Sequence, residues 1–213
     1  METIVYLVRH SEPFKKHMGI EKVNESQLFS NIKTPLSICG EKLAEKISNN
    51  NEFKNIDVVW SSAYVRAMST AKYFAYNNNV KVNVDERFGE RIHGCKYSEL
   101  PDKFEVKQAL NENFKMPNGE SQIEVRNRMY SALMEVINEN KGKRILILTH
   151  STAMLFLLLK WCKLNINEDS FSLKYNDSTI FNANNFIYCE IFKLTFDESN
   201  NVIDIKNWRK IDV

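Results

Sequence analysis

The chain has 213 residues, of which 43% are hydrophobic and 26% are charged, close to the average of globular proteins. This composition excludes a disordered chain, a collagen-like fibre and a long coiled coil. With 29 basic and 27 acidic residues the net charge is +2, too balanced to indicate a nucleic-acid-binding surface, so we expect one domain over residues 1–213 that binds no nucleic acid.

Short apolar runs alternate with helical patterns along most of the chain. In chain order, the patterns predict a strand at 3–8, a helix at 37–49, a strand at 57–60, a helix at 63–76, a strand at 80–84, a helix at 121–140, a strand at 144–149 and a helix at 151–164. Ser37 is expected to cap the first helix. Strands that alternate with helices in this way favour a largely parallel sheet covered on both faces.

The end of the chain departs from this alternation. Residues 186–196 and 202–208 flank the sequence DESNN and predict an antiparallel hairpin at one edge of the sheet. Residues 91–118 have weak periodicity and are expected to leave the sheet as a small cap. The predicted fold class is therefore α/β: a three-layer α/β/α domain with a mostly parallel central sheet, an antiparallel C-terminal edge hairpin and a cap-like excursion.

The cysteines and the N-terminus bear on the compartment. The four cysteines are far apart and form no CxxC or Cys/His cluster, so we expect neither a zinc site nor a disulfide framework: Cys39, Cys95, Cys162 and Cys189. The start of the chain lacks a signal-peptide pattern, and the apolar run at 153–159 is too short to cross a bilayer. These features predict a cytoplasmic protein without membrane association.

Histidine and arginine follow three of the predicted strands, although arginine is scarce in this chain, with eight against 21 lysines. The residues after these strands are Arg9-His10-Ser11, then Ser61-Ser62 with Arg66 one turn later, and His150-Ser151. Because the carboxyl ends of parallel strands meet at one edge of a sheet, we expect two histidines and two arginines to converge there. Histidine can carry a phosphoryl group and arginine binds phosphate oxygens in a bidentate way, so the pattern predicts phosphoryl transfer without a metal.

Several short motifs, spread over nearly the whole chain, support this interpretation. They are LVRHSE at 7–12, TPLSICGEKLA at 34–44, SSAYVRAMSTA at 61–71, VDERFGERIHG at 84–94, PNGES at 117–121, LTHS at 148–151 and NDST at 176–179. In order and spacing they resemble the motifs of the histidine phosphatase superfamily, also called the phosphoglycerate mutase-like family.

The resemblance implies a role for each matching residue. His10 would be the nucleophile that forms a phosphohistidine, and Arg9, Arg66 and His150 would surround the phosphoryl oxygens. The proton donor would be Glu90, with Glu86 as the competing candidate in the same motif. No metal and no cofactor are expected.

Two serines and one loop depart from the family pattern. Ser11 and Ser151 stand where the family usually has glycine, and both are expected to contact the bound phosphate. The segment 13–34 carries Lys15, Lys16, His17 and Lys22, which would either contact an anionic substrate or form a solvated basic loop.

The sequence thus predicts a metal-independent phosphomonoester hydrolase that acts on a small phosphorylated molecule. Two alternatives stay open: a phosphoglycerate mutase-type transfer, disfavoured because such mutases carry longer insertions than this chain has between residues 90 and 117, and a catalytically silent phosphate-binding or protein-interaction module. The oligomeric state stays open, with a homodimer paired through the C-terminal edge strand as one option, and the substrate stays open as well.

Overall fold

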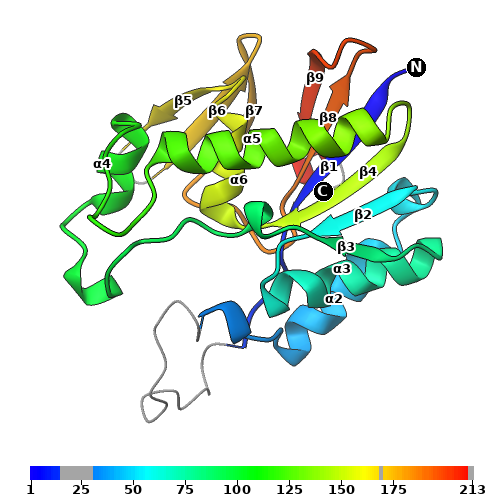
Figure 1. The fold of residues 1–213 in the computed structure, drawn as a ribbon, viewed down its shortest axis with the longest axis horizontal. Helices are drawn as coiled ribbons and strands as arrows, with labels where there is room; N and C mark the ends of the chain where they lie inside the picture. Colours follow the sequence, from blue (N-terminus) through cyan, green and yellow to red (C-terminus); the bar gives the residue numbers. More distant parts are fainter. Residues whose placement is uncertain (15–30, 168–169, 211–213) are drawn as a thin grey trace.

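A six-stranded sheet forms the centre of the computed structural model, which describes residues 1–14, 31–167 and 170–210 (Figure 1). Its strands, in spatial order, are β3 (Val82–Val84), β2 (Val58–Ser61), β4 (Arg144–Thr149), β1 (Thr3–Arg9), β8 (Ile191–Phe196) and β9 (Val202–Asn207). The strands from β3 to β1 are parallel, whereas β8 is antiparallel to β1 and β9 is antiparallel to β8. The mostly parallel sheet and its C-terminal edge hairpin are confirmed.

Helices cover both faces of this sheet (Figure 1). Successive residues of β1 face opposite layers: Val5 and Leu7 belong to the core shared with α5 (Gln122–Glu139) and α6 (Ser151–Leu158). Tyr6 and Val8 belong to the core shared with α2 (Ile38–Ser48) and α3 (Val65–Asn78). A central strand buried on both faces needs this continuous apolar run, so the three-layer prediction is confirmed. Within the described residues, no helix is long and apolar enough to cross a bilayer.

The N-terminus of α2 lies directly against the segment that follows β1. Ser37 is its N-cap, as predicted, and its hydroxyl accepts a hydrogen bond from the Gly40 amide at 2.9 Å. A Cβ at Gly40 would lie 2.2 Å from the carbonyl oxygen of Glu12, a distance that no side chain tolerates. Glycine at this position therefore lets the helix approach the end of β1 closely.

The helix predicted at 151–164 is too long. Helix α6 ends at Leu158, and the chain then forms a separate antiparallel sheet of β5 (Lys163–Ile166), β6 (Phe171–Tyr175) and β7 (Ser178–Ala183), in the order β5-β6-β7. A short apolar run does not distinguish a buried helix from a strand, and here pairing with β6 decides the conformation of residues 163–166. Asn176 and Asp177, within the NDST motif, form the left-handed turn between β6 and β7, with φ of 45° and 62°.

Phenylalanine side chains attach the small sheet to the central one. The ring of Phe186 lies 4.6 Å, centroid to centroid, from Phe181 of β7 and 5.4 Å from both Phe171 of β6 and Phe192 of β8. Edge-to-face packing of this kind fixes the position of β5-β6-β7 relative to the carboxyl end of the central sheet.

The excursion at 91–118 contains α4 (Phe104–Leu110) and is closed at its base by two glycines. Gly94 has a φ of +82°, and a Cβ there would lie 2.1 Å from the amide nitrogen of Gly119. Next to this contact, the Glu120 amide donates to the carbonyl oxygen of Ile92 at 2.8 Å. The two ends of the excursion are therefore held side by side, and α4 stands beside the carboxyl edge of the sheet.

Candidate active site

The three strand ends singled out by the sequence meet at one edge of the sheet. The His10 amide donates to the carbonyl oxygen of Thr149, and the Ser62 amide donates to that of Leu148, both at 3.0 Å. These bonds align the residues that follow β1, β2 and β4. The predicted convergence of His10, Arg66 and His150 is seen in direct side-chain contacts between them.

His10 is held in one tautomer by its two neighbours. Its Nδ1 lies 2.7 Å from the carbonyl oxygen of Ser11, which can only accept, and its Nε2 lies 3.0 Å from Nε of Arg66, which can only donate. The proton of the neutral ring therefore resides on Nδ1, and Nε2 carries the lone pair. The side chain of His10 is buried at the floor of the pocket, and Nε2 is the atom equipped to act as a nucleophile.

His150 is held in the opposite tautomer. Nη2 of Arg66 approaches its Nδ1 at 3.2 Å and must donate, so the proton resides on Nε2, which lies 2.7 Å from the hydroxyl of Ser62. Complete burial, together with the nearby His10 and Arg66, holds the pKa of His150 well below its usual value of 6.5. At neutral pH His150 is thus an uncharged hydrogen-bond donor.

The two arginines bring fixed positive charge to the same place. Arg66 is 4% exposed; its Nη1 donates to the carbonyl oxygen of Asn31 at 2.6 Å. Arg9 donates through Nη1 to the carbonyl oxygen of Phe186, and its guanidinium carbon lies 4.6 Å from the ring centroid of Tyr188. Burial lowers the pKa of both guanidinium groups, which stay protonated at neutral pH.

One buried donor of Arg9 lacks a partner. Within the described residues, its Nε is buried and makes no hydrogen bond. An unsatisfied buried donor on a cation costs free energy unless a ligand satisfies it, and an anionic oxygen is the natural acceptor. This end of the pocket is therefore suited to phosphate.

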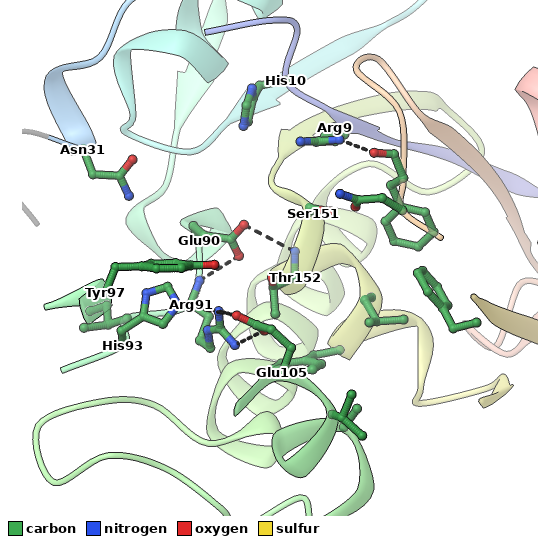
Figure 2. A pocket seen from close by; sticks show the side chains of 18 of the residues that line it. Arg9, His10, Asn31, Glu90, Arg91, His93, Tyr97, Glu105, Ser151 and Thr152 are labelled. Carbon is green, nitrogen blue, oxygen red and sulfur yellow. Dashed lines mark hydrogen bonds and ion pairs between the residues drawn. The ribbon is translucent and has the colours of Figure 1, made fainter. Parts of the chain in front are cut away.

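Glu90 lies in the pocket and Glu86 does not. The Glu90 carboxylate accepts hydrogen bonds from the amides of Arg91 and Ala153, both at 2.9 Å, and of Thr152 at 3.3 Å (Figure 2). It thereby caps the N-terminus of α6 from across the pocket. Glu86 is exposed in a short 3-10 turn and is absent from the pocket wall. Of the two candidates, the structure brings only Glu90 to the site.

Arg128 of α5 holds the segment that carries Glu90, and sequence reasoning missed it. Its guanidinium donates to the carbonyl oxygens of Arg87 at 2.7 Å, Gly89 at 3.0 Å and Glu90 at 3.2 Å, and forms an ion pair with Glu120 at 2.6 Å. Two features of the sequence could have pointed to Arg128: arginine is scarce in this chain, and the PNGES motif contains a glutamate that could pair with it. Tyr188 and Asn31, which also line the pocket, had no comparable signal.

The two serines expected at the phosphate differ in position. Ser151 lines the pocket in the first turn of α6, as expected (Figure 2). Ser11 is fully buried outside the pocket wall: its amide donates to the hydroxyl of Thr70 at 3.0 Å and its own hydroxyl donates to the carbonyl oxygen of Gly40 at 2.7 Å. The close approach of α2 and α3 turns the side chain of Ser11 into the core, and the substrate contact expected of this residue stays a prediction.

The pocket above these residues has a volume of about 1370 Å³ and extends well beyond them. It is bounded by α4 and the excursion on one side and by α6 and β5-β6-β7 on another. Lys15, Lys16, His17 and Lys22 lie outside the described residues. Within the described part of the chain, no group of three or more His, Cys, Asp or Glu side chains is placed to hold a metal ion.

Comparison with known families identifies this arrangement. The profile of the histidine phosphatase superfamily (branch 1) matches residues 5–185, which include all the strand ends described above. The chain belongs to this superfamily.

Individual relatives include both mutases and phosphatases. A probable phosphoglycerate mutase, GpmB, of Escherichia fergusonii is 28% identical over 158 residues, 70% of each chain. Phosphoserine phosphatase 1 of Hydrogenobacter thermophilus is 26% identical over 162 residues, 70% of this chain and 71% of its own. Among solved structures, a mycobacterial glucosyl-3-phosphoglycerate phosphatase in complex with inorganic phosphate has the same fold, with a TM-score of 0.68, 15% identity and 96% of each chain covered.

Proposed function

We propose that the protein is a phosphomonoester hydrolase that works through a phosphohistidine on His10 without a metal. The observation that carries the proposal is the lone pair on Nε2 of His10, fixed by Ser11 and in contact with the buried guanidinium of Arg66, in a pocket that Arg9 also lines. Phosphoryl transfer depends mainly on positioning and charge neutralisation, and this cluster supplies both.

In the first step Nε2 of His10 attacks phosphorus in line with the ester oxygen. The P–O bond to the alcohol breaks, the electron pair leaves with the oxygen, and a proton from Glu90 converts the alkoxide to the free alcohol. The charge that develops on the imidazole ring is stabilised by the Nδ1–H bond to the carbonyl oxygen of Ser11. Arg9 and Arg66 donate to the phosphoryl oxygens, and neutral His150 positions the guanidinium of Arg66 by accepting a hydrogen bond from its Nη2.

In the second step water attacks the phosphohistidine, Glu90 accepts its proton, and inorganic phosphate is released. The two carboxylate oxygens of Glu90 are not equivalent. Oε1 accepts two bonds of 2.9 Å, whereas Oε2 accepts one of 3.3 Å, so Oε2 has more capacity left to hold and release the proton. Arg128 acts as a positioning residue because it holds the backbone of residues 87–90.

The experiment is isolation of the phosphoenzyme. Protein quenched during turnover of a labelled phosphomonoester in the presence of chelator should hold label that is acid-labile and stable to alkali, as a phosphoramidate is. His10→Ala should hold no label and show no turnover. Full activity of His10→Ala, or loss of wild-type activity in chelator that metal restores, contradicts the mechanism.

A mutase is the second candidate, because relatives named as probable phosphoglycerate mutases match the chain. The two activities differ in the fate of the phosphohistidine. A hydrolase passes the label to water, whereas a mutase returns it to a second hydroxyl of the sugar acid. Following labelled phosphoenzyme with and without phosphoglycerate distinguishes them.

A further inference from the structure

The pocket has a second half, away from His10, whose wall is apolar. The side chains that form it come from α6, from the small sheet and from the segment after β7: Leu155, Leu164, Ile166, Phe171 and Phe186. Asn167, Asn184 and Asn185 add neutral polar groups to the lining. This wall therefore carries no charge.

Another part of the pocket lining carries charges that are already paired. Arg91 is 4% exposed and forms two hydrogen bonds to the Glu105 carboxylate of α4, at 2.7 and 2.9 Å (Figure 2). Nε2 of His93 lies 2.6 Å from Nη2 of Arg91. Burial would raise the pKa of Glu105, but hydrogen bonds from His93 and Arg91 outweigh it and lower that pKa to about 2, so the ion pair persists through the physiological pH range.

Among the lining residues that the structure describes, little positive charge is thus left for a second anionic group of the substrate. Among the described lining residues beyond Arg9 and Arg66, the buried cation is Arg91, and Glu105 neutralises it. Lys96 is the other cation there, and its side chain is exposed to solvent, which screens its charge. A carboxylate next to the apolar wall would lose its hydration, and the described lining there offers it neutral amide groups but no cation.

We propose that this half of the pocket is a leaving-group subsite for an alcohol with an uncharged, apolar or aromatic body, and that it disfavours substrates whose alcohol body carries a carboxylate. The inference rests on the proposed function, since it names the ester that His10 would cleave. A pocket of about 1370 Å³ exceeds the volume that a phosphate and a three-carbon acid need. Burial of the alcohol body against Ile166 and Phe171 supplies the extra binding free energy.

The test is a series of n-alkyl phosphates from ethyl to hexyl. The leaving-group pKa hardly changes along this series, so a rise in kcat/KM reports burial of the chain and not chemistry. Each buried methylene should raise kcat/KM about two- to fourfold, and hexyl has four more than ethyl, which gives a hexyl-to-ethyl ratio of about 16 to 250. A carboxylate at the end of the hexyl chain should lower kcat/KM at least about tenfold.

Two variants locate the effect. Ile166→Ala should lower the hexyl-to-ethyl ratio at least about threefold because it removes part of the wall. Ile203→Ala is the matched control, since Ile203 is 46% exposed on β9 and does not line the pocket; it should keep the wild-type ratio. Glu105→Gln should narrow the gap between hexyl phosphate and its carboxylate analogue, because it leaves the charge of Arg91 unpaired.

The outcomes separate this inference from the proposed function. If the wild-type protein hydrolyses these esters through His10 but with a ratio near one, or prefers the carboxylate analogue, the subsite is overturned and the hydrolase stands. If Ile166→Ala and Ile203→Ala keep the same ratio, the apolar wall is not the origin of the preference. If no phosphate ester is hydrolysed at all, the proposed function itself fails.

Discussion

Replacing Arg66 by lysine keeps a positive charge at the phosphate end of the pocket but removes the planar fork. Arg66 uses its three nitrogens separately, toward His10, Asn31 and His150, at 3.0, 2.6 and 3.2 Å. A single ammonium group cannot reach all three acceptors. Nδ1 of His150, which is fully buried, would lose its donor, and a phosphate would lose one of two parallel hydrogen bonds.

The expected size of the effect follows from these losses. A hydrogen bond to a charged group contributes about 1.5–3 kcal/mol, so kcat/KM of Arg66→Lys should fall about 10- to 150-fold. The assay is hydrolysis of p-nitrophenyl phosphate, with the inhibition constant of inorganic phosphate measured alongside, which should rise. Arg87→Lys is the matched control, because Arg87 makes a similar fork to Asp85 and Glu135 but has a side chain that is 39% exposed and does not line the pocket. Wild-type kinetics in Arg66→Lys would refute the role assigned to its fork.

Three further predictions follow from other residues. Glu90→Gln should slow hydrolysis of alkyl phosphates about 10²- to 10⁴-fold and of p-nitrophenyl phosphate far less, because only the alkoxide needs a proton; Glu86→Gln should affect both substrates alike. If the leaving-group dependence follows Glu86 instead, the assignment of the acid is wrong. Ser11→Gly should leave kcat/KM within about twofold and lower the free energy of unfolding by about 0.5–1.5 kcal/mol, since its hydroxyl bonds to Gly40 and not to substrate; a large loss of phosphate affinity would contradict this. Because the pKa of His150 is depressed in the folded protein, the unfolded chain takes up the extra proton as pH falls below 6.5, and the free energy of unfolding should then fall by up to about 1.4 kcal/mol per pH unit. Denaturant unfolding between pH 5 and 8 should show this slope reduced in His150→Gln, and an unchanged slope would assign it to other groups.

The sequence by itself determined the order of the main elements and the residues at the strand ends. The apolar runs of β1 and β4 indicate burial on both faces because each residue contacts one of two helix layers, and this pattern is local. The parallel arrangement then places Arg9, Arg66 and His150 near His10, since parallel strands end at one edge. The reactive cluster was therefore predictable before any coordinates.

The choice between Glu86 and Glu90 depended on the tertiary structure. Glu86 and Glu90 both come soon after the same strand, and each stands directly before an arginine. Neither the local pattern nor the composition therefore shows which of them lies in the pocket. The separation comes from residues distant in the chain: the first amides of α6 bind the Glu90 carboxylate, and Arg128 of α5 binds the backbone that carries it.

The position of the Ser11 side chain and the second half of the pocket also depended on the tertiary structure. The hydroxyl of Ser11 points to Gly40 because α2 packs against the end of β1, a contact that the motif around His10 does not encode. Residues 163 and 164 stand at the end of the predicted helix, and they belong to β5 because β6 offers backbone hydrogen bonds. Hydrogen-bond partners and packing neighbours far along the chain decide such positions, so the cluster around His10 follows from the sequence, whereas the apolar half of the pocket is defined only in the folded structure.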